Sequence, residues 1–278
     1  MKERKLKKRN LREAPAVVIA AFGTTSRGKA AYDRFDKKLR EHYPGHEIQW
    51  AYTSEIIREK TGVPGILQAL AQLEDRGYRK AVIQPLQIFP GTEYQMLIET
   101  CNAFPGMRIV AGETLLHRWQ YVHEVFELIA GSFLKHDEGF NIVVAHGTPL
   151  CTDPANILYL SLDSYITQRF NNTFLATVDG IPDRVWALNE LFAHPEAENK
   201  KRVRLIPFMF ISGLHFEHDL MGDDNSFKTA LQSRGCQVEC LNVEHEAEVY
   251  SKGLGFYEGI PEIFIKRVER AMSLMEIY

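Results

Sequence analysis

The sequence predicts an α/β protein of two similar Rossmann-like lobes, each built on a parallel sheet flanked by helices. Short apolar segments alternate with longer amphipathic ones along the 278 residues, as in βαβ units with right-handed crossovers. Several short segments are apolar on both faces, which is typical of strands buried between two helical layers. Two motifs also recur in the same order in the second half. These observations divide the chain into a basic N-terminal arm (1–15), a first lobe (16–138) and a second lobe (139–278).

Eight segments are expected to form strands, four in each lobe. They are residues 16–23, 47–54, 80–89, 108–113, 141–147, 173–180, 203–211 and 237–243. Between them, residues 65–78, 117–135 and 262–277 place apolar side chains at helical intervals. No linker rich in proline, glycine or serine separates the halves, so the two lobes follow each other directly.

The recurring motifs are two strands with the turns that follow them. Residues 17–25 (VVIAAFGTT) match residues 141–149 (NIVVAHGTP) at a shift of 124 positions, and both contain a Gly-Thr turn. Residues 80–93 match residues 202–215 at a shift of 122 positions, with a proline and a glycine in the same places. Motifs that keep their order at nearly one offset indicate a duplicated α/β lobe.

Three candidate site residues lie at or just past the ends of these strands. His146 precedes the second Gly-Thr turn, and Glu93 falls on His215 when the later motifs are aligned. Ligands of open α/β sheets bind beyond the carboxyl ends of the strands, so two facing lobes would bring these side chains to one cleft. Imidazole is a common ligand of divalent transition metals. The ordinary alternatives are a core histidine at His146, an acid in a first helical turn at Glu93, and a weak HxxH pair at His215 and His218.

Composition argues against several other classes of protein. A formal net charge of -3 disfavours a nucleic-acid binder that depends on a general basic field, and only the arm at 1–15 is basic enough to contact nucleic acid or an anionic surface. No segment approaches the length of a membrane-spanning helix. The four cysteines lack zinc or redox spacing, which favours reduced thiols in a cytoplasmic protein. The segment FGTTSRGK lacks the pattern of a phosphate-binding loop, so no nucleotide is expected.

Six motifs, taken together and in order, resemble the anaerobic cobalt chelatases of the CbiK type: AFGTT, WAYTSEIIREK, LQIFPGTEYQML, VVAHGTP, TVDGIP and LIPFMFISGLHFEHDLMGDD. These enzymes are class II chelatases, which share the fold of ferrochelatase. The resemblance covers nearly the whole chain, and it implies a chelatase fold with the active-site cleft between two lobes. It also implies ATP-independent insertion of Co²⁺ into sirohydrochlorin, or precorrin-2, on the anaerobic route to cobalamin.

The resemblance assigns metal binding and catalysis to His146, His215 and Glu93. The chain departs from the family pattern at Gln87, where members often carry histidine, and at Asp179, where they often carry glutamate. Those departures leave the expected metal ligands intact. They bear on the identity of the metal and of the tetrapyrrole, and on any additional haem site.

Three basic residues near strand ends of the first lobe, Arg27, Lys29 and Arg58, are candidates to bind the carboxylates of the tetrapyrrole. Three alternative functions remain from the sequence. One is an iron or nickel chelatase acting on the same macrocycle. Another is a tetrapyrrole- or haem-binding protein without insertase activity, and the third is a zinc metallohydrolase. Apolar helix faces such as residues 157–166 are compatible with a homo-oligomer or simply with the core.

Overall fold

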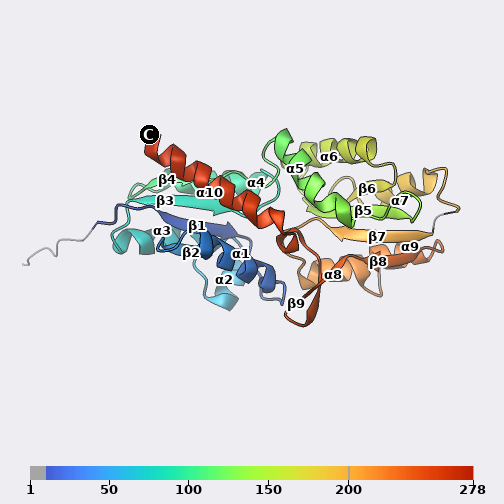
Figure 1. Ribbon diagram of the computed structural model, residues 1–278, viewed down its shortest axis with the longest axis horizontal. Coiled ribbons are helices and arrows are strands. Elements are labelled where there is room, and N and C mark those ends of the chain that lie inside the picture. Colours follow the sequence, from blue (N-terminus) through green and yellow to red (C-terminus); the bar gives the residue numbers. More distant parts are fainter. Residues whose placement is uncertain (1–10, 200, 278) are drawn as a thin grey trace, which may run out of the picture.

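Two four-stranded parallel sheets, one in each half of the chain, form the framework of the protein (Figure 1). The computed structural model describes residues 11–199 and 201–277, with side chains for all of them except residues 214 and 215. Most of the predicted basic arm therefore lies outside the described residues. All eight predicted strands are present, and the two sheets have the same order, β2-β1-β3-β4 and β6-β5-β7-β8. The predicted α/β architecture with two similar parallel sheets is confirmed.

The first half contains β1 (Ala16–Ala21), α1 (Lys29–His42), β2 (Ile48–Tyr52), α2 (Glu55–Thr61), α3 (Ile66–Asp75), β3 (Lys80–Pro85), α4 (Thr92–Ala103), β4 (Arg108–Ala111) and α5 (Trp119–Ile129). The second contains β5 (Phe140–Gly147), α6 (Ala155–Arg169), β6 (Thr173–Asp179), α7 (Arg184–Ala193), β7 (Arg202–Pro207), α8 (Leu214–Met221), α9 (Phe227–Gln232), β8 (Gln237–Cys240), β9 (Asn242–His245), β10 (Glu248–Ser251) and α10 (Gly259–Ile277). Within the described ranges, no helix combines the length and apolar character needed to cross a membrane.

The two sequence repeats occupy equivalent places in the two sheets. β1 pairs with β3 as far as Ala20 opposite Pro85, and β5 pairs with β7 as far as Val144 opposite Pro207. From Ala20 to Val144 is 124 positions and from Pro85 to Pro207 is 122, the two shifts seen in the sequence. The duplicated strands therefore end at the same level of their sheets, and the turns after them lie at equivalent edges.

Each half of the chain supplies one helix to the other half. The last helix, α10, packs against β3 and β4 of the first sheet (Figure 1). Helix α5 packs beside α6 of the second half, through a hydrogen bond between His123 and the Tyr165 hydroxyl (3.2 Å) and an ion pair between Glu127 and Arg169. The lobe boundaries after residues 15 and 138 stay a prediction. The helices that cover each sheet come from both sides of the second boundary.

Aromatic side chains join the two halves into one core. Phe35 of α1, Phe264 of α10 and Phe210, which follows β7, form a triangle with ring centroids 5.6, 5.9 and 6.1 Å apart. Tyr32 of α1 stacks on Phe210 from the other side, at 5.7 Å. Buried aromatic pairs of this kind contribute packing energy beyond their area. These contacts hold the segment after β7, which leads into α8, against the first lobe.

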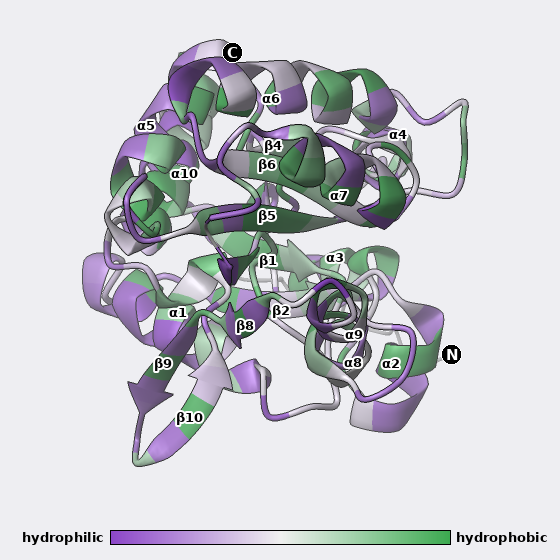
Figure 2. Cartoon of the chain, turned by 90° about the vertical axis from the view of Figure 1, so that its right-hand side faces the viewer, coloured by the Kyte–Doolittle hydropathy of each residue, from purple (hydrophilic) through white to green (hydrophobic). Residues whose placement is uncertain are grey.

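One antiparallel hairpin, β9–β10, was not predicted: only Asn242 and Val243 of β9 fall within the predicted strand at 237–243, and β10 falls within none. Its two central residues, Glu246 and Ala247, have φ of 50° and 63°. A two-residue turn with both φ positive normally carries Asn-Gly or Asp-Gly, so this sequence gives no hairpin pattern. The strands are largely exposed and hydrophilic, and they project from the second lobe beside α1 (Figure 2).

A pair of carboxyl groups lies between α6 and α7. Asp163 is only 8% exposed, and its Oδ1, like Oε2 of Glu190, has no hydrogen-bond partner within the described part of the chain. Burial and, to a smaller extent, the negative charge of Glu190 raise the pKa of Asp163, a hydrogen bond with the backbone of Leu175 lowers it, and the net result is a pKa of about 6. The folded protein therefore binds the Asp163 proton more tightly than the unfolded chain does, and the carboxyl group is mostly protonated only below about pH 6.

Candidate active site

The carboxyl ends of the strands of the two sheets meet at the junction of the lobes. Before α4 of the first lobe, the Thr92 backbone N–H donates to Oδ1 of Asp153, which precedes α6 of the second lobe (3.2 Å). A Cβ at Gly91 would lie 2.8 Å from the same oxygen, so a larger residue there would displace the Asp153 side chain. On the other side, Arg27 after β1 pairs with Glu217 of α8 (3.7 Å). The loops that carry the candidate residues thus face each other, as the fold class predicts.

Glu93 is the second residue of α4, at the edge of the first sheet. Glu93 is an exposed residue, yet the surrounding protein removes part of the hydration of its carboxyl group, and this desolvation raises its pKa. The Gln87 amide and the His146 ring lower that pKa, whereas the carboxylate of Asp153 raises it. Because groups of both lobes change its pKa, the Glu93 carboxyl group lies at the junction between the lobes.

His146 is exposed and lies at the end of β5 in the second sheet. Its Nδ1 is 3.3 Å from the carbonyl oxygen of Gly147, which accepts a hydrogen bond when Nδ1 carries the proton. That tautomer leaves the Nε2 lone pair available to a metal ion. Gly147 has φ of 82°, and a Cβ there would lie 1.6 Å from the Asp179 carbonyl oxygen. Glycine is therefore required to turn the chain immediately after the histidine.

Three further polar side chains interact electrostatically with Glu93, and none of them was predicted as a site residue. Tyr32 of α1 and Tyr159 of α6 are buried, their pKa values are raised mainly by that burial, and the charge of Glu93 raises both further. Tyr159 also contacts the backbone of Gly147 through a hydrogen bond. The Gln87 amide is buried and makes no hydrogen bond of ordinary geometry with the described residues, but it lies near enough to lower the pKa of Glu93. Two neutral phenols and an amide thus lie within electrostatic range of Glu93.

His215 is the second residue of α8 and so occupies the place in the second lobe that Glu93 has in the first. Both helices follow a glycine with extended backbone, Gly91 before α4 and Gly213 before α8. The side chain of His215 lies outside the described residues, and its approach to Glu93 and His146 stays a prediction. His218 lies a turn later, with its ring against Gly222 at the end of α8.

Arg27 and Lys29 line a polar groove of about 880 Å³ between α1 and the β9–β10 hairpin. The Arg27 guanidinium lies 5.5 Å from the centre of the Tyr250 ring, and Lys29 forms an ion pair with Asp33 (2.7 Å). The groove wall also carries other charged and polar groups from both lobes: Arg34, Lys37, Lys38, Glu41, His245, Glu246 and Glu248. The structure thus brings two of the three predicted carboxylate-binding residues to one surface.

Arg58 lies elsewhere, on α2 beneath the first sheet. A Cβ at Gly65 would lie 2.7 Å from its Nη1, so the guanidinium covers the turn before α3. Its Nε is buried without a hydrogen-bond partner in the described ranges. Arg58 does not line the groove formed by Arg27 and Lys29.

A smaller apolar cavity of about 100 Å³ adjoins the Glu93 side of the junction. Phe89, whose ring lies 4.4 Å from that of Tyr159, forms its inner wall. Its other walls come from the turn before α5, from α5 and from α6: Leu116, His117, Arg118, Trp119, Val122, Leu158 and Leu162. Apolar and aromatic surface therefore borders the polar residues around Glu93.

Solved structures identify the fold. The chain is similar to a structure described as SirB from Bacillus subtilis with Fe³⁺, with a TM-score of 0.61 and 12% identity, covering 94% of this chain and 97% of that one. It is also similar to CbiX, described as the terminal enzyme for biosynthesis of siroheme in denitrifying bacteria, with a TM-score of 0.54 and 15% identity, covering 93% and 99%. Two parallel sheets with the candidate residues at their meeting edges are thus the fold of the chelatases.

Comparison of the sequence with known proteins identifies the family. The family described as cobalt chelatase (CbiK) matches residues 15–273, and the chain belongs to this family of enzymes. It is 26% identical to the sirohydrochlorin cobaltochelatase CbiKC of Nitratidesulfovibrio vulgaris strain Hildenborough, over 94% of this chain and 91% of that protein. It is 22% identical to the sirohydrochlorin cobaltochelatase of Salmonella typhimurium strain LT2, over 93% and 97%. The predicted family and the prediction of an enzyme are confirmed.

Proposed function

We propose that the protein inserts Co²⁺ into sirohydrochlorin, or into precorrin-2, without ATP, as a cytoplasmic step of anaerobic cobalamin synthesis. The observation that carries this proposal is the hydrogen bond from Thr92, next to Glu93, to Asp153 across the junction of the two sheets, which places Glu93 near enough to His146 for the ring to lower its pKa, in a member of the cobalt chelatase family. The names of the two curated relatives support sirohydrochlorin as the macrocycle. Family membership favours this function over a metallohydrolase or a non-catalytic tetrapyrrole-binding protein.

In this proposal, His146, His215 and Glu93 hold Co²⁺ at the face of the macrocycle. The Nε2 atom of His146 is the free ring nitrogen when Nδ1 donates to the Gly147 carbonyl oxygen. Imidazole suits Co²⁺, and a three-residue set leaves positions open for water and then for the pyrrole nitrogens. An incomplete shell also binds the ion weakly enough to release it into the ring.

Glu93 is proposed to take part in proton transfer as well as metal binding. The pyrrole N–H protons must leave as the metal binds the ring nitrogens, and a base within hydrogen-bond reach accelerates that step. Desolvation raises the pKa of Glu93, which makes its carboxylate a stronger base than an ordinary surface glutamate. The neutral phenols of Tyr32 and Tyr159 beside it are suited to orient the carboxylate or a water molecule.

The carboxylates of the macrocycle are proposed to bind Arg27 and Lys29, while Arg58 stays a more distant candidate. The ion pair of Arg27 with Glu217 is long, at 3.7 Å, and half of the Arg27 side chain is exposed. Exposed pairs of this kind contribute little free energy, so Arg27 can exchange Glu217 for a substrate carboxylate at small cost. The cavity beside Phe89 and Trp119 would receive an apolar edge of the ring.

Anaerobic absorbance spectroscopy with sirohydrochlorin and Co²⁺, Fe²⁺ or Ni²⁺, each against a control without enzyme, tests the proposal. All three ions accept imidazole and carboxylate ligands, so the three rates must be compared. We expect the largest enzyme-dependent rate with Co²⁺. His146→Ala should lower it by roughly 100-fold because a ligand is lost, whereas His46→Ala in the first lobe should leave it unchanged.

Two results would contradict parts of the proposal. Spectral conversion at the uncatalysed rate while the macrocycle stays bound would leave a tetrapyrrole-binding protein without insertase activity. A faster enzyme-dependent rate with Fe²⁺ or Ni²⁺ would keep the chelatase reaction but overturn cobalt as its metal.

A homo-oligomer stays a prediction, and the exposed Ile157 and Leu160 of α6 are apolar residues that such an interface would use.

A further inference from the structure

A group of metal-binding side chains lies at the end of the second lobe away from the candidate active site. It consists of His136, in the loop before β5, and His194 and Glu196, which follow α7. His146 lies at the opposite end of β5, so the strand of 8 residues separates this group from the active site. At about 3.3 Å per residue, that distance is on the order of 25 Å. The group is therefore independent of the inter-lobe junction.

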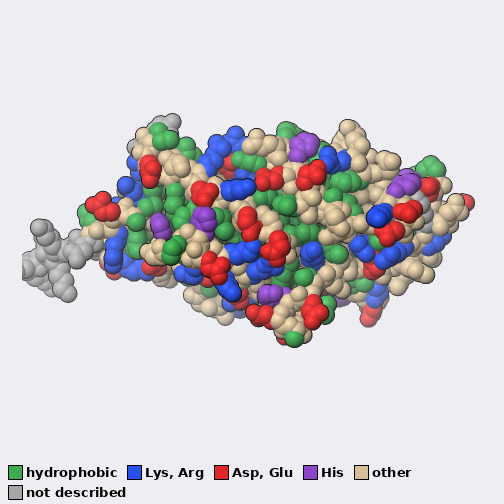
Figure 3. Space-filling view, in the orientation of Figure 1, with side chains coloured by type: hydrophobic (Ala, Val, Ile, Leu, Met, Phe, Trp, Pro, Cys, Tyr) green, Lys and Arg blue, Asp and Glu red, His purple; other side chains and the backbone are tan. Residues whose placement is uncertain are grey.

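The three side chains are close enough to share one ion. One ligand atom from each lies within 4.8 Å of the other two, and His136 Nε2 is 2.9 Å from Glu196 Oε2. Ligands at about 2.1 Å from a tetrahedral metal are roughly 3.4 Å apart, so a small inward movement of one ring completes the set. The Glu196 N–H donates to Nδ1 of His194 over a long 3.3 Å, a bond that a cation can replace. Figure 3 shows histidine and acidic side chains together at this end of the surface.

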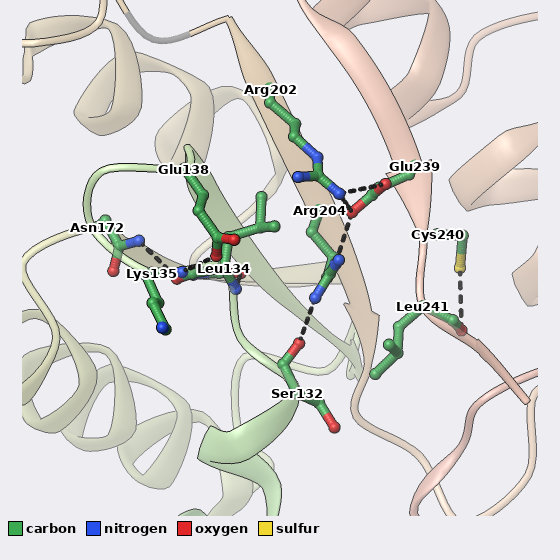
Figure 4. A network of polar contacts seen from close by, with 11 residues as sticks. Ser132, Leu134, Lys135, Glu138, Asn172, Arg202, Arg204, Glu239, Cys240 and Leu241 are labelled. Atoms are coloured by element: carbon green, nitrogen blue, oxygen red, sulfur yellow. Dashed lines mark hydrogen bonds and ion pairs between the residues drawn. The ribbon is translucent and has the colours of Figure 1, made fainter.

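The loop that carries His136 is held firmly by its neighbours (Figure 4). The Asn172 amide donates to the Leu134 carbonyl oxygen (2.9 Å), and the Leu134 N–H donates to Oδ1 of Asn141 (2.7 Å). Arg204, itself paired with Glu239 on β8 (2.7 Å), donates to the carbonyl oxygen of Ser132 (2.8 Å). A ligand on a backbone fixed in this way loses little conformational freedom when it binds an ion.

The other two ligands are fixed by the end of α7. His194 is the residue at which that helix ends, and its N–H donates to the Leu191 carbonyl oxygen (3.1 Å). Its ring lies 5.1 Å from the ring of Phe140 at the start of β5. Glu196 follows two residues later, so both ligands come from one short turn that packs against the sheet.

We infer that His136, His194 and Glu196 form a second binding site for a divalent transition-metal ion such as Co²⁺. Two imidazoles and one carboxylate favour Co²⁺, Ni²⁺ or Zn²⁺ over Mg²⁺ and Ca²⁺, which prefer oxygen ligands. Three protein ligands with partial exposure to solvent make an exchangeable site that is open to water. This inference does not depend on the proposed chelatase reaction, because it concerns metal binding in the absence of any macrocycle.

Equilibrium dialysis of the untagged full chain against cobalt chloride, with bound cobalt counted by elemental analysis, tests the site. A Glu93→Gln/His146→Ala background first removes ligands of the active site. In that background we expect the protein to bind cobalt. His136→Ala or His194→Ala should raise the dissociation constant for cobalt by at least about tenfold, because each removes a ligand. His42→Ala is the matched control, since His42 also pairs with a glutamate (Glu269, 2.8 Å) but has no third ligand nearby in the described ranges.

Excess Mg²⁺ should not displace the bound cobalt, and circular dichroism should show that each variant is folded. Equal cobalt binding by the His136→Ala and His42→Ala variants would overturn the inference, as would a background variant that binds no cobalt. Glu196→Gln supplies an independent check, because it keeps the shape of the turn and removes only the charge. Turnover plays no part in these measurements, so a failed insertion assay and a failed second site remain distinguishable.

Discussion

A Glu93→Gln variant is expected to insert Co²⁺ into sirohydrochlorin at least about 100-fold more slowly than the wild type, the usual range for loss of a positioned acid-base group. Glutamine keeps the size of the side chain and its place at the start of α4, but it neither accepts a pyrrole proton nor offers an anionic oxygen to the metal. The single-turnover rate of spectral conversion at saturating Co²⁺ is the measurement, since saturation separates weakened metal binding from slowed chemistry.

Glu99→Gln is the matched control for that experiment, because Glu99 is exposed on the same helix. Both variants should be folded, and only Glu93→Gln should turn over more slowly than the wild type. If Glu93→Gln turns over within about threefold of the wild type, Glu93 takes no part in proton transfer, since that difference is below 1 kcal/mol. Metal handling would then rest on the two histidines alone.

Replacing Asp163 by asparagine is expected to stabilise the protein at neutral pH. Asp163 is buried beside Glu190, and its pKa is raised from 3.8 to about 6. A shift of that size corresponds to about 3 kcal/mol that the ionised carboxylate costs the folded state above pH 6, by linkage. Asparagine removes the charge and keeps an oxygen that can accept the hydrogen bond with the Leu175 backbone.

The sign of the pH dependence follows from the raised pKa. Between about pH 4 and 6 the folded protein binds more protons at this site than the unfolded chain, so the wild type loses stability as pH rises through this range. The free energy of unfolding in urea should thus fall more steeply there for the wild type than for Asp163→Asn. Asp224→Asn, at an exposed position, is the control. Identical pH profiles for wild type and Asp163→Asn would show that Asp163 does not titrate in this way.

The strands of both sheets were predictable because buried strands are rich in apolar residues. β1 and β5 are buried along nearly their whole length, and a strand covered on both faces must be apolar at consecutive positions. The repeat was predictable for a related reason: Pro85 and Pro207 end equivalent ladders, and glycines follow at equivalent turns. Positions whose local geometry requires one residue type are the easiest to recognise in a sequence.

The β9–β10 hairpin and the exchange of α5 and α10 were not predictable from the sequence. The hairpin turn uses Glu246 and Ala247 at positive φ, where neither residue is a usual choice. The exchange depends on which sheet an amphipathic helix covers, and an apolar helix face carries no information about its partner. Both features are decided by tertiary packing.

The candidate site was predictable only where its residues lie at strand ends. His146 and Glu93 were identified there, and their electrostatic contact lies at the expected junction. Tyr32 and Tyr159 lie within α1 and α6, where a tyrosine on the buried face looks like any other core aromatic. Gln87 stood out only as a departure from the family pattern, and its place beside Glu93 required the structure.

Anomalous diffraction at the cobalt edge, from crystals of the wild type equilibrated with Co²⁺, tests whether the two lobes meet at a metal site. We expect a peak about 2.0–2.3 Å from Nε2 of His146 and from a carboxylate oxygen of Glu93, the usual range for nitrogen and oxygen ligands. A peak at His136 and His194 would be a separate finding. Cobalt bound between the lobes but out of reach of both His146 and Glu93 would show that these residues do not form the metal site.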